Sequence, residues 1–320
     1  MKIIAQLILL ASAMLLIQCQ SRSDRQVGEG ELAGSITLSG AWALYPMAVK
    51  WAEEFERLHH HVRIDVAAGG AGKGMADALA GVADIGNVSR DIYPQEIAQG
   101  AWWVSVTKDA VVPTVNAGNP HLQQLLRQGM DRETLRSIWI TGTTTSWGRV
   151  IKQYAPDQIH VYTRSDACGA AKTWAKYLGE NQEDLLGVGV YGDPGLAEAV
   201  RQDQLGIGYN NINYAYDAQS KAQVAGIRVL PIDLNNNARL DSTEDFYHDR
   251  DQIVRAIARG QYPSPPARDL YFVCQGKPEK KLVREFIRWV LTDGQQYVAE
   301  SGYIQLPSEI LKAQLKRMGE

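Results

Sequence analysis

The 320-residue sequence has only three cysteines and no excess of positive charge. Three cysteines cannot form the framework of a small disulfide-stabilised protein. Thirty-three Lys and Arg against 36 Asp and Glu give a formal net charge of -3, so a general nucleic-acid-binding surface is excluded. With 45% hydrophobic residues the chain is neither disordered nor collagen-like. Any anion-binding site must therefore depend on positive groups gathered at one place and not on the charge of the whole protein.

A long hydrophobic run occurs near the N-terminus. Lys2 precedes an apolar run over residues 3–17, which is shorter than the about 20 residues of a membrane span and is typical of a signal peptide. The run ends in Leu16-Ile17-Gln18-Cys19, which resembles a bacterial lipobox, although Gln18 stands where a small residue is usual. We expect a signal peptide over 1–18, lipidation of Cys19 and a flexible membrane tether over 19–33. The alternative is export without lipidation.

Strand and helix patterns alternate along the remaining chain. Alternating apolar residues at 36–38 precede a helix pattern that begins near Pro46, and a second strand pattern at 62–66 precedes a helix through Met75. Further helices are expected at 121–127, 132–139, 281–291 and 294–301, and further strands at 111–116 and 160–162. This alternation predicts an α/β fold with loops at the carboxyl ends of the strands, and the length predicts two domains.

Four loops of small residues follow strands and open helices. They cover residues 39–42, 69–74, 87–90 and 164–170. The start of a helix offers unpaired backbone N–H groups and partial positive charge, so such loops suit an anion. Lys73, Arg90 and Arg164 lie in three of them. The set predicts one small anionic ligand held between two domains.

Nucleotide-binding motifs do not fit the glycine-rich loop. A P-loop requires Ser or Thr after its lysine, but Gly74 follows Lys73. The dinucleotide-binding motif requires a third glycine where Met75 stands. The loop therefore indicates an anion site without a nucleotide.

At these loops the sequence resembles the phosphate-binding proteins of bacterial phosphate ABC transporters. The resemblance runs from Gly34 to about Leu306, and its motifs include Ser39-Gly40, Gly69-Gly70-Ala71-Gly72, residues 83–90, Arg164 with Cys168-Gly169, and Ile207-Gly208-Tyr209. It implies the type II periplasmic binding-protein fold, an α/β fold of two lobes joined by crossover hinge strands. The first lobe would comprise residues 34–113 and 268–320, and the second 114–267. The two lobes would close on a ligand about the hinge.

The resemblance also implies a ligand-binding set. Its members are Ala41, Trp42, Ala43, Ala71, Gly72, Lys73, Ser89, Arg90, Arg164, Cys168, Gly169 and Ala170. Ser89 and Arg164 match the family, but hydroxyl residues expected in the other loops are missing. Each hydrogen bond to a charged group contributes about 1.5–3 kcal/mol, so losing several removes most of a micromolar affinity of about 8 kcal/mol. The backbone N–H groups of these loops are unaffected by the side-chain replacements and could still donate to an anion.

Three interpretations of the function therefore stay open. The first is a monomeric, lipid-anchored envelope protein that delivers phosphate to an ABC permease. The second is a binding protein adapted to an organophosphate, a phosphonate or a carboxylate. The third is a degenerate binding-protein fold that serves as a surface or scaffold module. None of the three is an enzyme.

Residues 233–244 match the pattern of an EF-hand calcium loop. The ligand positions are Asp233, Asn235, Asn237, Arg239 through its carbonyl, Asp241 and Glu244. Ala238 replaces the usual glycine. We expect structural calcium here, and the alternative is an Asn-rich surface turn without metal.

The two cysteines outside the signal region are expected to be unpaired. Cys274 lies in an apolar strand pattern, whereas Cys168 lies at a turn that opens a helix. A catalytic role for Cys168 would need a base and a third orienting residue, and the sequence identifies no such set.

Overall fold

The computed structural model describes residues 31–319. The predicted signal peptide, Cys19 and most of the predicted tether lie outside these residues. Within 31–319, no helix combines the length and the apolar character needed to cross a membrane.

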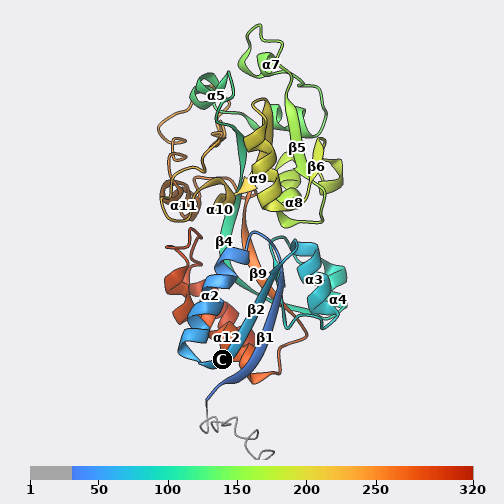
Figure 1. Ribbon diagram of the computed structural model, residues 1–320, viewed down its shortest axis with the longest axis vertical. Coiled ribbons are helices and arrows are strands. Elements are labelled where there is room, and N and C mark those ends of the chain that lie inside the picture. Colours follow the sequence, from blue (N-terminus) through green and yellow to red (C-terminus); the bar gives the residue numbers. More distant parts are fainter. Residues whose placement is uncertain (1–30, 320) are drawn as a thin grey trace, which may run out of the picture.

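The chain forms two lobes (Figure 1), and each lobe has its own hydrophobic core. The first lobe has a core built from residues between 36 and 106 and between 270 and 318. The core of the second lobe is built from residues between 110 and 267, with Ile304. The chain therefore leaves the first lobe, builds the second and returns.

The elements divide between the lobes and the strands that connect them. The first lobe contains β1 (Ala33–Gly40), α2 (Tyr45–Leu58), β2 (His61–Ala68), α3 (Ala71–Leu79), β3 (Ile85–Val88), α4 (Pro94–Ala98), α12 (Lys281–Leu291), the 3-10 helix η2 (Asp293–Tyr297) and α13 (Ser308–Met318). The second contains α5 (Leu122–Gln128), α6 (Arg132–Trp139), α7 (Trp147–Ile151), β5 (His160–Arg164), α8 (Gly169–Leu178), η1 (Gln182–Asp184), β6 (Val188–Val190), α9 (Gly192–Gln202), β7 (Gly206–Asn211), α10 (Ile212–Ala215), β8 (Ile227–Val229) and α11 (Arg250–Ala258). The connecting strands are β4 (Ala101–Asn116) and β9 (Ala267–Gln275).

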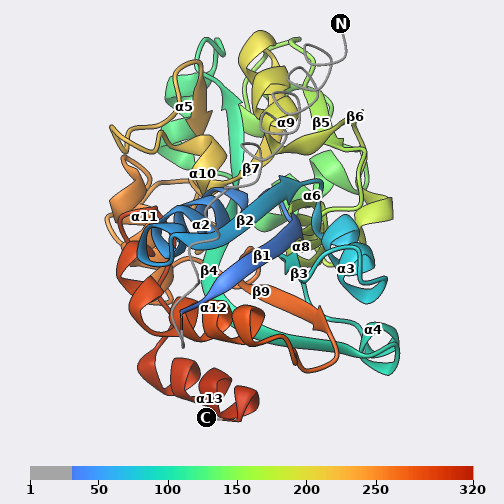
Figure 2. The ribbon, with the colours of Figure 1, turned by 60° about the horizontal axis from the view of Figure 1, so that its bottom comes forward.

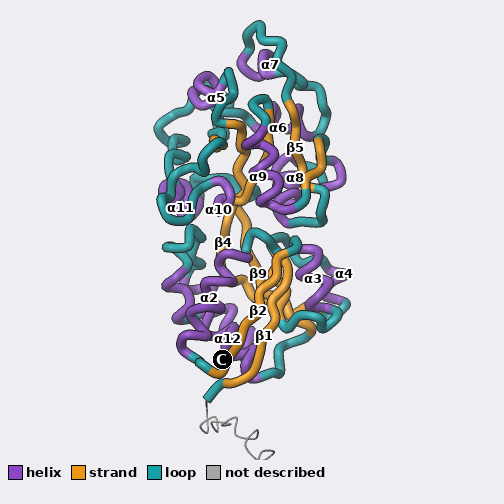
Figure 3. The backbone as a smooth tube through the Cα atoms, in the orientation of Figure 1, coloured by secondary structure: helices purple, strands orange, loops and turns teal. Residues whose placement is uncertain are grey.

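Strands β4 and β9 form the hinge. The sheet order is β2-β1-β3-β9-β4-β7-β5-β6, with β8 paired to β4. Residues 101–110 of β4 pair antiparallel with β9, whereas residues 111–116 pair with β7 and β8 in the second lobe. Figure 3 shows β4 passing from one lobe into the other. The two-lobed α/β fold with crossover strands, expected from the sequence, is confirmed.

Local sequence explains why the first lobe forms as it does. Pro46 stands in the first turn of α2, and the helix buries one face with Met47, Ala48, Trp51, Ala52 and Phe55. Buried residues alternate with exposed ones along the first half of β2.

Glycines bring α3 against the strands. A Cβ at Gly40, Gly74 or Gly86 would clash with neighbouring backbone, so their lack of a side chain allows α3 to approach β1 and β3 closely. This close packing positions the start of α3 beside the lobe boundary. Figure 2 shows α3 next to β1 and β3.

Two expectations differ from the structure. The helix expected at 294–301 is a short 3-10 helix, Asp293–Tyr297, followed by turns. The strand expected at 111–116 is the end of the much longer β4, which is buried almost throughout. A strand buried on both faces lacks the alternation by which half-buried strands are recognised.

Candidate anion site

The loops singled out in the sequence meet where the two lobes touch. The Gly72 N–H at the start of α3 donates to the Ala167 carbonyl of the second lobe, with an N–O distance of 3.1 Å. Ser89, after β3, packs against Gly169, where a Cβ would clash with the Ser89 hydroxyl and carbonyl. Loops from both lobes therefore form one contact region.

The first loop, after β1, also reaches the second lobe. Its Ala41 N–H donates to the Asn87 carbonyl at 2.8 Å, which fixes the loop against β3. Trp42 is half-buried with its indole beside Gly192, and the Tyr214 hydroxyl donates to the Trp42 carbonyl at 3.2 Å. Ala43 is buried. Trp42 packs across the lobe boundary, where the sequence analysis expected a ligand contact.

Arg164 is the most enclosed cation of the set. It is the last residue of β5, and its side chain is 0% exposed. Its Nε and Nη2 donate to the two carboxylate oxygens of Asp166 at 2.8 and 2.6 Å. Its Nη1 donates to Asp193 Oδ2 at 2.6 Å. The guanidinium is therefore held between two carboxylates.

This pairing keeps Arg164 charged and limits its free donors. Burial alone would lower the pKa of Arg164, but Asp193 and Asp166 outweigh burial and raise it. An arginine has five N–H groups, and three of those of Arg164 donate to the two carboxylates, so two do not take part in these ion pairs. One guanidinium against two carboxylates gives the cluster a net negative charge, so binding a highly charged anion needs further donors.

Those further donors lie at the start of α8. Cys168 is the N-cap residue, and its Sγ accepts a hydrogen bond from the Ala171 N–H at 3.4 Å. Gly169 and Ala170 are the first two helical residues, so their N–H groups have no carbonyl of a preceding turn to bind. Both residues are buried, and Gly169 lies against Ser89 of the first lobe. The arrangement offers backbone donors and a helix dipole to an anion.

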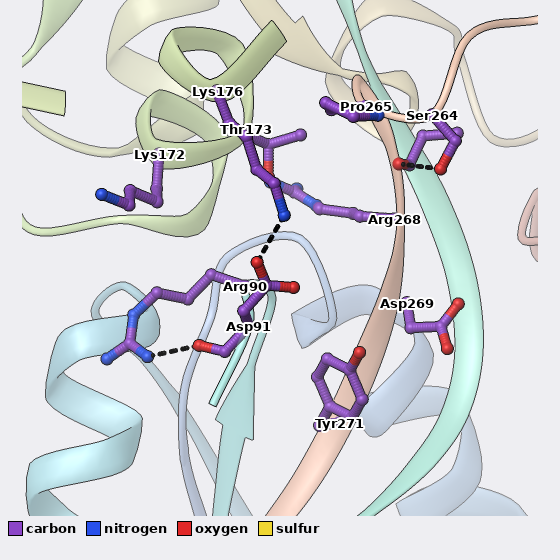
Figure 4. Close-up of a pocket in the computed structure, with 11 residues that line it drawn as sticks. Arg90, Asp91, Lys172, Thr173, Lys176, Ser264, Pro265, Arg268, Asp269 and Tyr271 are labelled. Carbon is purple, nitrogen blue, oxygen red and sulfur yellow. Dashed lines mark hydrogen bonds and ion pairs between the residues drawn. The ribbon is translucent and has the colours of Figure 1, made fainter. Parts of the chain in front are cut away.

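Lys73 and Arg90 are directed to carboxylates of their own lobe. The Lys73 ammonium binds the Ser39 hydroxyl at 2.8 Å and the Asp77 carboxylate. Arg90 forms a two-hydrogen-bond pair with Glu96, at 2.9 and 2.6 Å, and stacks on the Tyr93 ring. Figure 4 shows Arg90 also bound to the Asp91 carbonyl. Neither cation shares the contacts that surround Arg164.

Cys168 and Cys274, the cysteines within residues 31–319, are free and buried, as expected for unpaired thiols. Burial raises the pKa of Cys168 to about 12, although Arg164 opposes the shift. Burial also raises the pKa of Cys274 to about 12. A thiol with such a pKa is a poor nucleophile, so Cys168 acts here as a helix cap.

The partners of Arg164 were missed in the sequence analysis. Asp166 was detectable, because it lies two residues after Arg164 in the same loop. Asp193 comes from the first turn of α9, and its proximity to Arg164 depends on β5 and β7 lying side by side. A Gly-Asp-Pro sequence opening a helix was its one signal.

The predicted calcium loop is a hydrogen-bonded turn at the surface of the second lobe. Asp233 accepts from the N–H groups of Asn237 and Ala238 at 3.2 and 2.8 Å, and Glu244 accepts from the N–H of Asn235 at 3.2 Å. Ala238 adopts a positive φ of 57°. The Asn235 and Asn237 amides donate to Asp241, and these hydrogen bonds lower the pKa of Asp241.

The acidic and neutral oxygen donors of this loop suit a hard cation. Asp233, Asp241 and Glu244 supply carboxylates, and the Arg239 carbonyl belongs to the same turn. Counting His, Cys, Asp and Glu alone, residues 31–319 contain no group of three or more that could hold a metal ion. A cation here would therefore also need the amide oxygens of Asn235 and Asn237.

Similarity to known proteins extends along most of the chain. A family model described as a PBP superfamily domain matches residues 26–294. The phosphate-binding protein PstS of Methanocaldococcus jannaschii is 26% identical, and the alignment covers 97% of this chain and 92% of that protein. PstS of Pseudomonas aeruginosa is 24% identical, with 90% and 88% covered.

Solved structures show the same architecture. A putative phosphate ABC transporter substrate-binding protein from Clostridium perfringens, with bound phosphate, has a TM-score of 0.70 at 21% identity, and 86% of this chain and 100% of that chain are covered. An ABC-type phosphate transport receptor from Vibrio cholerae has a TM-score of 0.61 at 19% identity, with 85% and 100% covered. At these identities the likeness concerns the fold.

Proposed function

The chain belongs to the PBP superfamily and has the two-lobed type II binding-protein fold, and from this premise we propose that it is a solute-binding protein that captures phosphate between its lobes. The observation that carries the proposal is that buried Arg164 lies close enough to Cys168, the N-cap of α8, to act on its thiol, in a loop that binds the first lobe through the Gly72–Ala167 hydrogen bond. The PstS names of its relatives favour phosphate over other oxyanions. The role is binding and not catalysis.

Capture would proceed by opening and closing about β4 and β9. In the closed arrangement, the Gly72–Ala167 hydrogen bond and the Ser89–Gly169 contact join the lobes directly. Opening separates these loops and exposes the first N–H groups of α8 together with the two spare N–H groups of Arg164. A bound oxyanion would accept from these donors of the second lobe. It would favour closure by also accepting from first-lobe groups that face them, such as the Ser89 hydroxyl beside Gly169.

The ligand could also be a different anion, and two observations favour this second candidate. The residues at the hydroxyl positions of the family are Ala71, Cys168 and Ala170 in this chain, and Trp42 fills its place with an indole. The net negative charge of the Arg164 cluster also favours a ligand with few charges or with protons to donate. A phosphonate or a carboxylate fits these features as well as phosphate does.

The sequence and the relatives support a proposal for the cellular setting. We propose export by the signal peptide 1–18, anchoring by lipidated Cys19 and delivery of the ligand to an ABC permease by a monomer. The relatives named as substrate-binding proteins of ABC transporters support the permease partner. The lipobox-like Leu16-Ile17-Gln18-Cys19 supports the anchor.

We also propose that residues 233–244 bind structural calcium. The support is the match of the sequence to the EF-hand pattern and the oxygen donors gathered in one turn. The positive φ of Ala238 is the conformation for which that pattern normally uses glycine. Calcium would tie Asp233 and Glu244, at the two ends of the loop, together.

Calorimetric titration with phosphate, sulfate, a phosphonate and a carboxylate tests the function. The proposal predicts saturable binding of phosphate with one ligand per chain. Tighter binding of the phosphonate or the carboxylate would establish the second candidate. Binding of none of these anions would contradict both and leave the scaffold interpretation.

A further inference from the structure

A buried polar network connects the hinge to Arg164. Its first member is Arg268, at the start of β9, which is cross-strand partner to Asp109 on β4. Arg268 Nε and Nη2 donate to the two oxygens of Asp109 at 2.9 and 3.3 Å. Arg268 is 8% exposed and Asp109 is 1% exposed. This ion pair therefore lies inside the crossover strands that the lobes share.

The network leaves the hinge through Asn211, the last residue of β7. Arg268 Nη2 donates to the Asn211 side-chain oxygen. The Asn211 Nδ2 donates in turn to Asp193 Oδ1 at 2.6 Å, and Asp193 Oδ2 accepts from Arg164. An amide can link a guanidinium to a carboxylate because it carries both an acceptor and a donor.

A second branch reaches α8, the helix whose first N–H groups would bind the anion. Arg268 Nη1 donates to the Thr173 hydroxyl on α8 at 3.0 Å. Figure 4 shows Arg268 extending from β9 towards Thr173. Thr173 lies in the first half of α8, which begins at Gly169. One hinge side chain therefore contacts both parts of the second lobe that face the anion site.

We propose that Arg268 is a positioning residue for the anion site, acting on Arg164 through Asn211 and Asp193 and on α8 through Thr173. This inference rests on the proposed capture of an oxyanion by Arg164. Fixing the guanidinium before the ligand arrives reduces the conformational freedom lost on binding. A displacement of Arg268 would move Arg164, because every side chain of the network between them is buried and hydrogen-bonded to the next.

The test removes the Asn211 link between Arg268 and Asp193 and keeps the two ion pairs at the ends of the network. Asn211→Leu removes the link but leaves Arg268 with Asp109 and Arg164 with Asp193. Asn210→Leu is the matched control: Asn210 is also buried in β7, but its Nδ2 donates to the Thr114 hydroxyl instead. We expect Asn211→Leu to weaken phosphate binding at least about fivefold, and Asn210→Leu to leave the Kd unchanged even if both lower the melting temperature.

A double variant that exchanges the residues at positions 211 and 193 should restore phosphate affinity. In Asn211→Asp with Asp193→Asn, the carboxylate and the amide trade places, so the donors and acceptors still match and the net charge is unchanged. The exchange should recover most of the lost affinity, whereas Asn211→Asp alone places two carboxylates together and should not. Equal losses of affinity in the Asn211→Leu and Asn210→Leu variants, or no recovery in the exchange, would overturn the proposal.

A second measurement separates this inference from the proposed function. The side-chain Nε–H of Arg164 can be followed by NMR without any ligand and assigned with Arg164→Lys. Its solvent exchange should be slow in the wild type and in Asn210→Leu, and faster in Asn211→Leu. If the wild type bound no phosphate but the exchange followed this pattern, the proposed function would fail and the positioning role would stand. Unchanged exchange in Asn211→Leu would overturn the positioning role.

Discussion

The Ser89 side chain occupies the space that a Cβ at position 169 would need. Ser89 follows β3 in the first lobe and Gly169 begins α8 in the second, so this contact is made only when the lobes are closed. A larger residue at 169 would meet the Ser89 hydroxyl and carbonyl together. The close approach of the lobes therefore depends on a glycine at this position.

Gly169→Ala should hinder closure and weaken phosphate binding by about tenfold or more, since about 1.4 kcal/mol of obstruction is enough for that change. Small-angle scattering should show that phosphate no longer compacts the variant. Gly195→Ala in α9, whose added Cβ would lie 3.1 Å from one methyl group of Val190 and would meet no backbone atom, is the control. Phosphate binding of wild-type strength in Gly169→Ala would show that full closure is not needed.

The two buried thiols should be inert in the folded protein. With a pKa of about 12 for each, about one thiol in ten thousand is ionised at pH 8. Alkylation followed by peptide mapping should label Cys168 and Cys274 only after denaturation. Rapid labelling of Cys168 in the native protein would mean that the start of α8 opens readily.

Glu54 should make the stability of the first lobe depend on pH. Hydrogen bonds from Lys50 and then from Arg57 lower the pKa of Glu54 to about 2, compared with 4.5 for an unperturbed glutamate. Since the folded-state pKa is the lower one, the stabilisation is full above pH 4.5 and is lost as the pH falls towards 2.

The measurement is the melting temperature of Glu54→Gln between pH 7 and pH 3. The variant should melt below the wild type at pH 7, and the difference should shrink as the pH falls. Glu53→Gln changes the exposed neighbouring glutamate and serves as the control. A difference that is constant over the whole range would show that charge on Glu54 does not contribute.

Calcium should stabilise the second lobe. Calcium at about 100 times its Kd would contribute about 2.7 kcal/mol, which raises the melting temperature by about 5 °C or more for a domain of this size. Chelation should reverse the gain, and Glu244→Gln should abolish it. Glu309→Gln, on α13 of the first lobe, should respond like the wild type. No shift with millimolar calcium would leave residues 233–244 as a turn without metal.

The sequence was most informative where local signals are strong. Helices α6 and α12 have the bounds expected, Arg132–Trp139 and Lys281–Leu291. Asp131 caps the first of them by accepting from the Thr134 N–H, and the second has a continuous buried face. Capping and periodicity are properties of neighbouring residues, so they can be recognised without the fold.

The polar partners within the site could not be recognised in this way. Arg164 and Asp193 are 29 positions apart, and Arg268 and Asn211 are 57 apart. Arg268 reaches Asn211 because β4 lies between β9 and β7 in the sheet. Arg164 reaches Asp193 because β5 is adjacent to β7 and α9 packs against both strands. Lys73 and Arg90 pair with Asp77 and Glu96 in the same segments of the chain, and Arg164 likewise pairs with Asp166 two positions away. A carboxylate nearby in the sequence therefore does not decide which of these cations faces the ligand.

The central claim is that Arg164 binds an oxyanion at the boundary between the lobes, and phosphate titration of Arg164→Lys tests it most directly. Lysine keeps a positive charge beside Asp166 and Asp193 but lacks the planar set of donors. Arg201→Lys is the control, since Arg201 pairs with Glu198 at the surface of the same lobe. The account predicts saturable phosphate binding by the wild type and by Arg201→Lys, and a Kd at least about tenfold higher for Arg164→Lys. Equal affinity of Arg164→Lys and the wild type, or no phosphate binding by the wild type, would contradict it.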